Sequence, residues 1–205
     1  MRTSALIPVK LRGSKTRLAG VLLEEERADL VKYMLLDVMD AVKNMDGVVI
    51  VGPREIDDVL KGHDFELIVE EEASGLNNAV KAGNKWAMDM GVDATLFVPA
   101  DTPLIRKRHI DEILELGGKH PLIISPSRRG GTGVLFRRPP DIIGERFTSH
   151  SYSDYQAEAK ERGVEIYVYD SFALSLDIDT PEDIGEFMLH GEGTRTHAFL
   201  DKTRK

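Results

Sequence analysis

Residues that could bind a polyanion are concentrated at the start of the chain. Five cations precede the first acidic residue, which is at position 24: Arg2, Lys10, Arg12, Lys15 and Arg17. The segment 10–17, KLRGSKTR, also contains Gly13 and two hydroxyl side chains, so its backbone amides can approach an anion. We therefore expect Lys10, Lys15 and Arg17 to bind phosphate groups, with a solvated basic turn as the alternative. The segment does not match the Walker pattern, because no second glycine precedes a Lys-Ser/Thr pair.

Three aspartates follow apolar runs and could bind a divalent cation. Asp101 ends the segment VPAD, and Asp177 and Asp179 are two residues apart in LDID. Side chains two apart in an extended segment project to the same side, so these two carboxylates repel each other unless a cation lies near them. Carboxylate oxygens are the ligands that Mg²⁺ prefers, and we expect Mg²⁺-assisted phosphoryl chemistry. Capping of the turn or helix that follows is the alternative for Asp101 and Asp179.

Two further loops could contact the remainder of a substrate. The segment 74–78, SGLNN, opens a helix, so Gly75, Leu76, Asn77 and Asn78 offer amides that can contact a nucleobase. Plain helix capping by the serine at position 74 is the alternative. The segment 127–133, SRRGGTG, combines cations with a pliable backbone, which suits a second small phosphate or carboxylate, whereas an exposed hairpin turn is the alternative.

An alternation of short and long patterned segments predicts how these loops are positioned. Apolar runs typical of strands buried on both faces cover 5–9, 48–51, 65–69, 94–98, 122–125 and 164–169. Segments with helical spacing cover 24–44, 75–90, 108–116, 151–162 and 181–189. This rhythm predicts an α/β fold with a mostly parallel central sheet flanked by helices. Ligands bind in the crevice at the carboxyl ends of such strands, where the cationic loop and Asp101 are expected.

The composition excludes several kinds of site. Of 205 residues, 41% are hydrophobic and 30% are charged, which is enough apolar material for one sizeable core. The 27 Lys and Arg residues against 35 Asp and Glu residues give a net charge of −8, which excludes nucleic-acid binding by positive charge alone. Cysteine is absent, so disulfides, thiolate nucleophiles and cysteine-ligated zinc are excluded.

No segment of the sequence has the character of an interdomain linker. We expect one domain over 1–190 and a polar tail, 191–205, that is either a frayed end or an oligomer contact, so a homodimer stays open. No apolar run approaches the ~18 residues that span a bilayer, and the first residues lack the features of a signal peptide. We expect a cytoplasmic protein with no membrane and no nucleic acid among its partners.

Taken in order, five segments resemble the 2-phospho-L-lactate guanylyltransferases of coenzyme F-420 biosynthesis. They are IPVK-x4-K-x-RL at the N-terminus, SGLNxAxxAG at 74–83, VPADTPL at 98–104, SPSRRGGTG at 125–133 and LDIDTPED at 176–183. The resemblance covers 4–188 and implies a single-domain, Rossmann-like GT-A nucleotidyltransferase fold. It also implies the reaction of GTP with 2-phospho-L-lactate to give lactyl-2-diphospho-5′-guanosine and diphosphate. Phosphoenolpyruvate or a phosphoglycerate is the acceptor in related members.

The resemblance also implies roles for individual residues. The metal ligands fall on Asp101, Asp177 and Asp179, and the nucleoside segment on 75–78, with Gly13 in the triphosphate loop. The acceptor pocket falls on Thr132, Gly133 and Ser151, with Arg128 from the same loop. Two departures from the family pattern lie in that pocket: Gly133 stands where a polar residue is common, and 147–151 reads FTSHS where FGPxS is expected.

The implied reaction needs no general base, because the acceptor phosphate is already an anionic nucleophile at neutral pH. Two unit charges 4 Å apart repel by about 4 kcal/mol at an effective dielectric constant of 20, so two polyanions must be brought together against their charge. Mg²⁺ on the aspartates, and Lys10, Lys15 and Arg17 on the β- and γ-phosphates, would offset this repulsion. Lys10, Lys15, Arg17 and Asp101 are therefore the predicted catalytic residues.

Two other functions are alternatives. A nucleotidyltransferase of the molybdopterin or sugar-phosphate type usually carries a GGxSxRMG-type first loop, whereas PVKLRGSKTRL has a single glycine. A non-catalytic nucleotide-binding module with the same fold is disfavoured because all three acidic positions are occupied.

Overall fold

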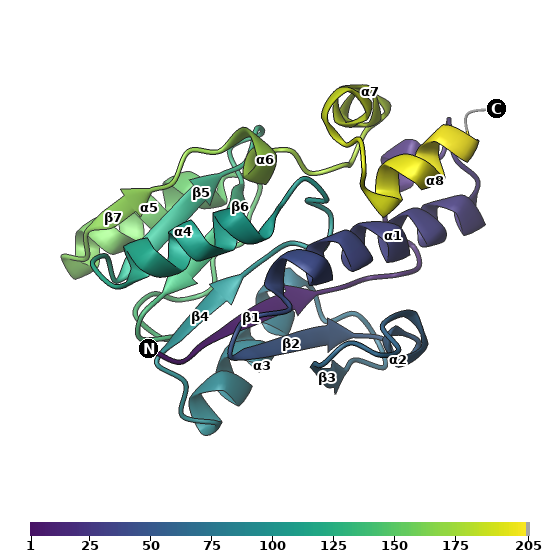
Figure 1. Cartoon of the computed structure of the whole chain (residues 1–205). Coiled ribbons are helices and arrows are strands. Elements are labelled where there is room, and N and C mark those ends of the chain that lie inside the picture. The colour runs from purple at the N-terminus through teal and green to yellow at the C-terminus, as the bar shows by residue number, and fades with distance from the viewer. Residues whose placement is uncertain (204–205) are drawn as a thin grey trace.

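A sheet of seven strands forms the centre of the protein in this computed structural model, which describes residues 1–203 (Figure 1). The strand order is β3-β2-β1-β4-β6-β5-β7, and neighbours are parallel except where β6 pairs with β4 and with β5. The strands are β1 (Thr3–Pro8), β2 (Gly47–Gly52), β3 (Glu66–Val69), β4 (Ala94–Phe97), β5 (Leu122–Pro126), β6 (Thr132–Arg137) and β7 (Ile166–Val168).

Helices cover both faces of this sheet. They are η1 (Thr16–Leu18), α1 (Glu24–Val42), α2 (Ile56–Val59), α3 (Leu76–Asp89), α4 (Lys107–Gly117), α5 (Ser151–Arg162), α6 (Phe172–Ser175), α7 (Pro181–His190) and α8 (Arg195–Thr203). Side chains of α1, α4, α7 and α8 pack in one core, and side chains of α3 and α5 pack in a second. In β1, Ala5 and Ile7 belong to the first core and Leu6 to the second, so the strand is apolar on both faces. In Figure 1, α1 and α3 lie on opposite sides of the sheet.

The predicted α/β fold with a mostly parallel sheet is confirmed, and one strand was not predicted. The six predicted strands are present, with ends shifted by two residues or fewer. The added strand is β6, which begins at Thr132 inside the segment predicted to be a flexible loop. Its first two residues, Thr132 and Gly133, follow two glycines and resemble the end of a turn, so the apolar residues 134–136 are too few to mark a strand.

The prediction of a frayed tail is wrong for most of its length, because α8 packs against α1. Leu200 is 1% exposed in the core, and the rings of Tyr33 and Phe199 stack with centroids 5.0 Å apart. The Asp37 carboxylate accepts hydrogen bonds of 2.9 Å from the backbone amides of Arg195 and Thr196, which caps the start of α8. The last two residues of the predicted tail, 204–205, lie outside the described residues. Within residues 1–203, no helix combines the length and apolarity needed to cross a bilayer.

Candidate active site

Three loops from distant parts of the chain meet at the carboxyl ends of β1 and β4. The first follows β1, the second follows β4 and carries Asp101, and the third is the extended segment 176–180 before α7. The Ile178 backbone N–H donates a 3.1 Å hydrogen bond to the carbonyl oxygen of Asp101. Because Ile178 stands between Asp177 and Asp179, this bond brings all three predicted aspartates to one edge of the sheet.

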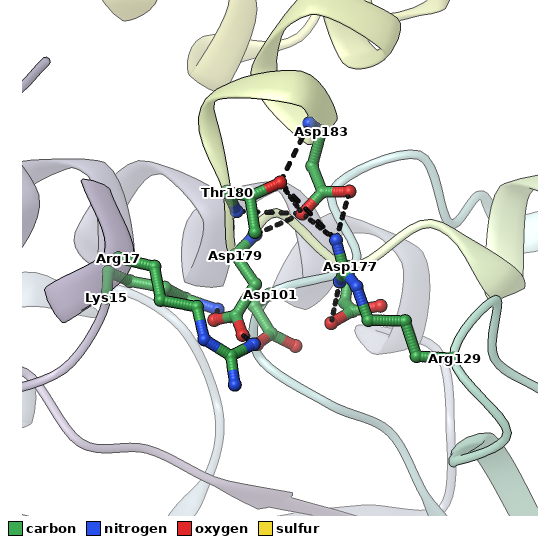
Figure 2. Close-up of polar contacts among 8 residues, drawn as sticks. All are labelled: Lys15, Arg17, Asp101, Arg129, Asp177, Asp179, Thr180 and Asp183. Atoms are coloured by element: carbon green, nitrogen blue, oxygen red, sulfur yellow. Dashed lines mark hydrogen bonds and ion pairs between the residues drawn. The ribbon is translucent and has the colours of Figure 1, made fainter. Parts of the chain in front are cut away.

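Lys15 lies between two of these aspartates (Figure 2). Its Nζ is 2.5 Å from a carboxylate oxygen of Asp101 and 3.2 Å from one of Asp179, and the side chain is only 7% exposed. Arg17 lies 3.0 Å from the other carboxylate oxygen of Asp179. Burial alone would lower the pKa of the Lys15 ammonium, but the two carboxylates outweigh burial and raise that pKa above its ordinary value. Lys15 is therefore a fixed positive charge in this site.

The loop that delivers Lys15 uses a left-handed backbone conformation. The φ angle is 63° at Gly13 and 53° at Lys15. A side chain other than glycine in this region costs roughly 1 kcal/mol or more, and the two ion pairs of Lys15 offset that cost. Backbone strain of this kind concentrates at functional sites, where the surrounding contacts hold it in place.

The third predicted aspartate, Asp177, lies near Arg129. Arg129 Nη1 is 3.8 Å from a carboxylate oxygen of Asp177. Burial and the charge of Asp101 raise the pKa of the Asp177 carboxyl above its ordinary value, although Lys15 and Arg129 act in the opposite direction. A carboxylate that is held close to another carboxylate marks a position where a further cation would be favourable.

The aspartates supply hard oxygen ligands, and Lys15 lies between two of them. Within the described part of the chain, no group of three or more His, Cys, Asp or Glu side chains is arranged to hold a metal ion. Lys15 Nζ lies between Asp101 and Asp179 and compensates the two negative charges. Because one cation contacts both carboxylates, these two residues fit a divalent cation as ligands, and Asp177, 3.8 Å from Arg129, stays a predicted third ligand.

Asp183 was not among the predicted site residues, yet it organises the third loop. Its carboxylate accepts hydrogen bonds from the backbone amides of Asp179 (3.0 Å) and Thr180 (2.8 Å) at the start of α7. Arg129 Nη2 donates to both of its oxygens at 2.8 Å (Figure 2). Burial would raise the pKa of Asp183, but these donors outweigh burial and lower it below its ordinary value. The capping motif Thr-x-x-Asp at 180–183 is the sequence signal that could have identified it.

A cavity of about 220 Å³ opens beside Lys15, and we call it the lysine cavity. Its lining includes Lys10, Ser14, Lys15, Asp101 and Asp179. The hydroxyl of Ser14 has no hydrogen-bond partner among the described residues. The structure thus brings together Lys10, Lys15 and Asp101 as predicted. The Ser14 hydroxyl in the cavity wall is free to donate a hydrogen bond to an anion.

A second cavity, of about 210 Å³, is also lined by Asp101, and we call it the hydroxyl cavity. Thr132 and Ser151 line it, and their hydroxyl oxygens are 2.9 Å apart. Asp101 and Leu76 line both cavities, so the two are adjacent.

One residue of the predicted acceptor pocket lies elsewhere, and another lines the cavity as expected. Arg128 does not line the hydroxyl cavity; it contacts Glu186 at 3.3 Å and lies over the ring of Phe172. Its neighbour Arg129 is the one that points to the aspartates. Gly133 does line the cavity, and a Cβ atom there would lie 2.2 Å from the carbonyl oxygen of Leu174. The backbone of Leu174 thus comes so close to position 133 that only glycine fits there, where the family pattern has a polar residue.

The predicted nucleoside segment begins α3 but uses its side chains differently from the prediction. Gly75 has a φ of 91°, which favours glycine at this helix start. The Asn78 amide donates to the carbonyl oxygen of Ser74 (2.9 Å), and the Asn77 amide contacts the backbone of Phe147. Neither carboxamide is thus presented to a base in this structure.

A third cavity, of about 180 Å³, lies beyond Lys10, which also lines the lysine cavity; we call it the glutamate cavity. Apolar walls come from Val9, Leu11 and Pro53, and the carboxylates of Glu70 and Glu71 also line it. The Ser74 hydroxyl donates to Glu70. Sequence reasoning did not single out these glutamates, because a run of three acidic residues resembles a solvated surface.

A cationic cavity and a hydroxyl-lined cavity that share one aspartate, at the carboxyl end of a mostly parallel sheet, are the features of a nucleotidyltransferase. Comparison with known proteins agrees: residues 3–205 match the family model described as "Guanylyl transferase CofC like". The chain belongs to this family of CofC-like guanylyl transferases. The family resemblance inferred from the sequence is thereby confirmed.

Named relatives match the chain over nearly its full length. It is 39% identical over 201 residues to the 2-phospho-L-lactate guanylyltransferase of Methanocaldococcus jannaschii, covering 98% of this chain and 88% of the relative. It is 38% identical over 212 residues to the protein of the same name from Methanothermobacter thermautotrophicus, covering 100% of this chain and 92% of the relative.

Solved structures share the fold at low sequence identity. A nucleotidyl transferase from Methanothermobacter thermautotrophicus has a TM-score of 0.62 and 17% identity, covering 98% of this chain and 99% of that one. The 4-diphosphocytidyl-2C-methyl-D-erythritol synthase of Anaerococcus prevotii has a TM-score of 0.61 and 16% identity, covering 98% of both chains. These likenesses confirm the expected nucleotidyltransferase fold.

Proposed function

We propose that this enzyme transfers GMP from GTP to the phosphate of 2-phospho-L-lactate, which gives lactyl-2-diphospho-5′-guanosine and diphosphate. The observation that carries the proposal is the position of Asp101 in the walls of both the lysine cavity and the hydroxyl cavity. One cavity would hold the triphosphate and the other the phosphorylated acid. The reacting phosphorus atom then lies at the boundary between them.

The lysine cavity suits the triphosphate. Lys10, Lys15 and Ser14 line it, and Arg17 lies at Asp179 on its edge. In the reaction, an oxygen of the acceptor phosphate forms a bond to the α-phosphorus, and the bond from that phosphorus to the bridging oxygen of the diphosphate breaks. The leaving diphosphate takes the electron pair, so cations fixed beside it stabilise the transition state more than the ground state.

The hydroxyl cavity suits the acceptor phosphate. Thr132 and Ser151 offer two hydroxyl groups there, and Ser151 is the first residue of α5, whose N-terminus favours an anion. The acceptor phosphate needs no deprotonation at neutral pH, so these residues bind and orient it and remove no proton. Phosphoenolpyruvate has the same phosphate and carboxylate groups, and is the second acceptor to test.

Asp101, Asp177 and Asp179 are the residues that would hold Mg²⁺ in this enzyme. The ion would neutralise charge on the phosphate oxygens when bound. Lys15 already contacts the carboxylates of Asp101 and Asp179, so the chain itself keeps them close together in the absence of nucleotide.

The glutamate cavity suits the guanine base. Guanine presents two adjacent donors, N1–H and the exocyclic amine, and a carboxylate accepts from both. The Glu70 carboxylate already accepts from Ser74, whereas no hydrogen bond joins the Glu71 carboxylate to another described residue. Glu55 also lines this cavity, and we assign the recognition of guanine to Glu71, with Val9 and Leu11 beside the ring.

A diphosphate-release assay with a matrix of substrates tests this proposal. GTP, ATP, CTP and UTP would each be combined with 2-phospho-L-lactate, phosphoenolpyruvate, 3-phosphoglycerate and glucose 1-phosphate. We expect release only with GTP and a phosphorylated acid that carries a neighbouring carboxylate. Release with glucose 1-phosphate, or equal rates with all four nucleotides, would contradict the proposal. A cytoplasmic location and a homodimer remain predictions.

A further inference from the structure

The carboxamide of Asn77 joins the start of α3 to a loop far away in the sequence. Its Oδ1 accepts a 2.7 Å hydrogen bond from the Phe147 backbone N–H, and its Nδ2 donates to the Phe147 carbonyl oxygen at 3.4 Å. One exposed side chain thus pairs with both backbone groups of a residue 70 positions later. The loop containing Phe147 has no regular secondary structure of its own before α5 begins.

The two ends of this link adjoin the walls of the substrate cavities. Leu76, the neighbour of Asn77, lines both the lysine cavity and the hydroxyl cavity. Phe147 lines the hydroxyl cavity together with Thr148, the next residue of the loop, and Ser151, the first residue of α5. Asn77 itself lines neither cavity, so its carboxamide contacts the loop and not a substrate.

The ring of Phe147 packs against two other aromatic rings. Its centroid lies 4.4 Å from that of Phe97, at the end of β4, and 5.6 Å from that of Tyr155 on α5. Ring contacts of this kind restrain the side chain, but they leave the backbone free to slide or rotate along the apolar surface. The directional bonds from Asn77 remove that freedom, because an N–H donor and a carbonyl acceptor must both meet one carboxamide.

We infer that Asn77 is a positioning residue: it holds the loop 147–151 against the start of α3, so that the acceptor phosphate faces the nucleotide. This inference rests on the proposed function, which places the acceptor in the hydroxyl cavity. It predicts that loss of the carboxamide weakens the productive binding of the acceptor and leaves the binding of GTP intact.

Steady-state kinetics of Asn77→Ala, measured with both substrates varied, test this role. We expect the KM for the acceptor to rise about fivefold to tenfold, the value of one net hydrogen bond, while the KM for GTP stays within about twofold. Asn77→Asp keeps an oxygen that accepts from the Phe147 N–H, and we expect it to recover most of the lost acceptor affinity. Asn44→Ala, in an exposed position after α1, is the matched control and should change neither KM.

Hydrogen exchange of the same variants shows whether the link holds the loop. We expect Asn77→Ala to accelerate amide exchange in residues 146–151 and nowhere in the central sheet, and Asn44→Ala to leave this segment unchanged. An unchanged acceptor KM in Asn77→Ala, or an equal rise of both KM values, would overturn the positioning role.

Thr132→Val separates this result from the proposed function. If Thr132→Val raises the acceptor KM and Asn77→Ala does not, the acceptor binds in the hydroxyl cavity as proposed, and the positioning role of Asn77 is wrong. If the wild-type enzyme releases no diphosphate with any phosphorylated acid, the proposed function itself fails.

Discussion

Lys15 Nζ lies 2.5 Å from a carboxylate oxygen of Asp101, and this ion pair connects the loop after β1 to the loop after β4. Both residues also line the lysine cavity, and Asp179 contacts the same Nζ from the third loop. The ammonium and the carboxylates therefore stabilise one another before any substrate binds. A site that is assembled in advance does not need to reorganise its charges during the reaction.

Asp101→Asn should lower turnover by about 100-fold or more, because Asp101 is the charged residue that lines both cavities. The fold should remain intact, since Asn has the same shape and Asp101 is partly exposed. Diphosphate release at saturating GTP and Mg²⁺, with a thermal melt of the same sample, measures both effects. Asp111→Asn, on the exposed surface of α4, is the control, and equal turnover in the two variants would count against this role.

Lys15→Ala should raise the KM for GTP by about tenfold or more, since a hydrogen bond to a charged phosphate contributes about 1.5–3 kcal/mol. The acceptor KM should change less, because Lys15 does not line the hydroxyl cavity. Rates measured over a range of GTP concentrations at fixed acceptor check this expectation. An unaltered dependence on GTP would remove Lys15 from the triphosphate site.

Glu71→Gln should erase most of the preference for GTP over inosine triphosphate, which lacks the exocyclic amine of guanine. The amide keeps one acceptor oxygen but replaces the other with a donor, so it cannot accept from both guanine groups. The ratio of kcat/KM for the two nucleotides, expected to be about tenfold or more in the wild type, is the readout. Glu72→Gln, the adjacent residue that does not line the glutamate cavity, should keep the wild-type ratio.

Asp183→Asn should destabilise the protein by about 2 kcal/mol at pH 7, because the carboxylate is 5% exposed and accepts from Arg129, Asp179 and Thr180. Those donors lower the pKa of Asp183 in the folded state below its ordinary value. The stability that the Asp183 carboxylate contributes is therefore fully present at a pH above the ordinary pKa of aspartate. This stability is lost as the pH falls through the lowered pKa of the folded state. The difference in urea unfolding between wild type and variant should be present at pH 7 and shrink as the pH falls below the ordinary pKa of an aspartate; a constant difference would contradict this.

The position of the site could be predicted from the sequence, because it depends on strand order. Lys15 and Asp101 each follow an apolar run, and the carboxyl ends of parallel strands meet at one edge. The run 5–9 and the run 94–98 are neighbouring strands in the sheet, which brings these two side chains into contact.

The roles of several individual residues could not be predicted, because these roles depend on tertiary contacts that leave no local signal in the sequence. Arg128 and Arg129 are equivalent in sequence, and only the turn between β5 and β6 decides that Arg129 faces the aspartates. The requirement for Gly133 comes from the backbone of Leu174, which is distant along the chain. The polar segment that forms α8 is ordered by Asp37, a single buried carboxylate on α1.

The most direct measurement is a crystal structure of the protein with a non-hydrolysable GTP analogue, Mg²⁺ and phosphoenolpyruvate. We expect the triphosphate in the lysine cavity, the α-phosphorus beside Asp101, and the acceptor phosphate against Thr132 and Ser151. A nucleotide bound in another cavity, or an acceptor phosphate far from the α-phosphorus, would contradict the two-cavity arrangement.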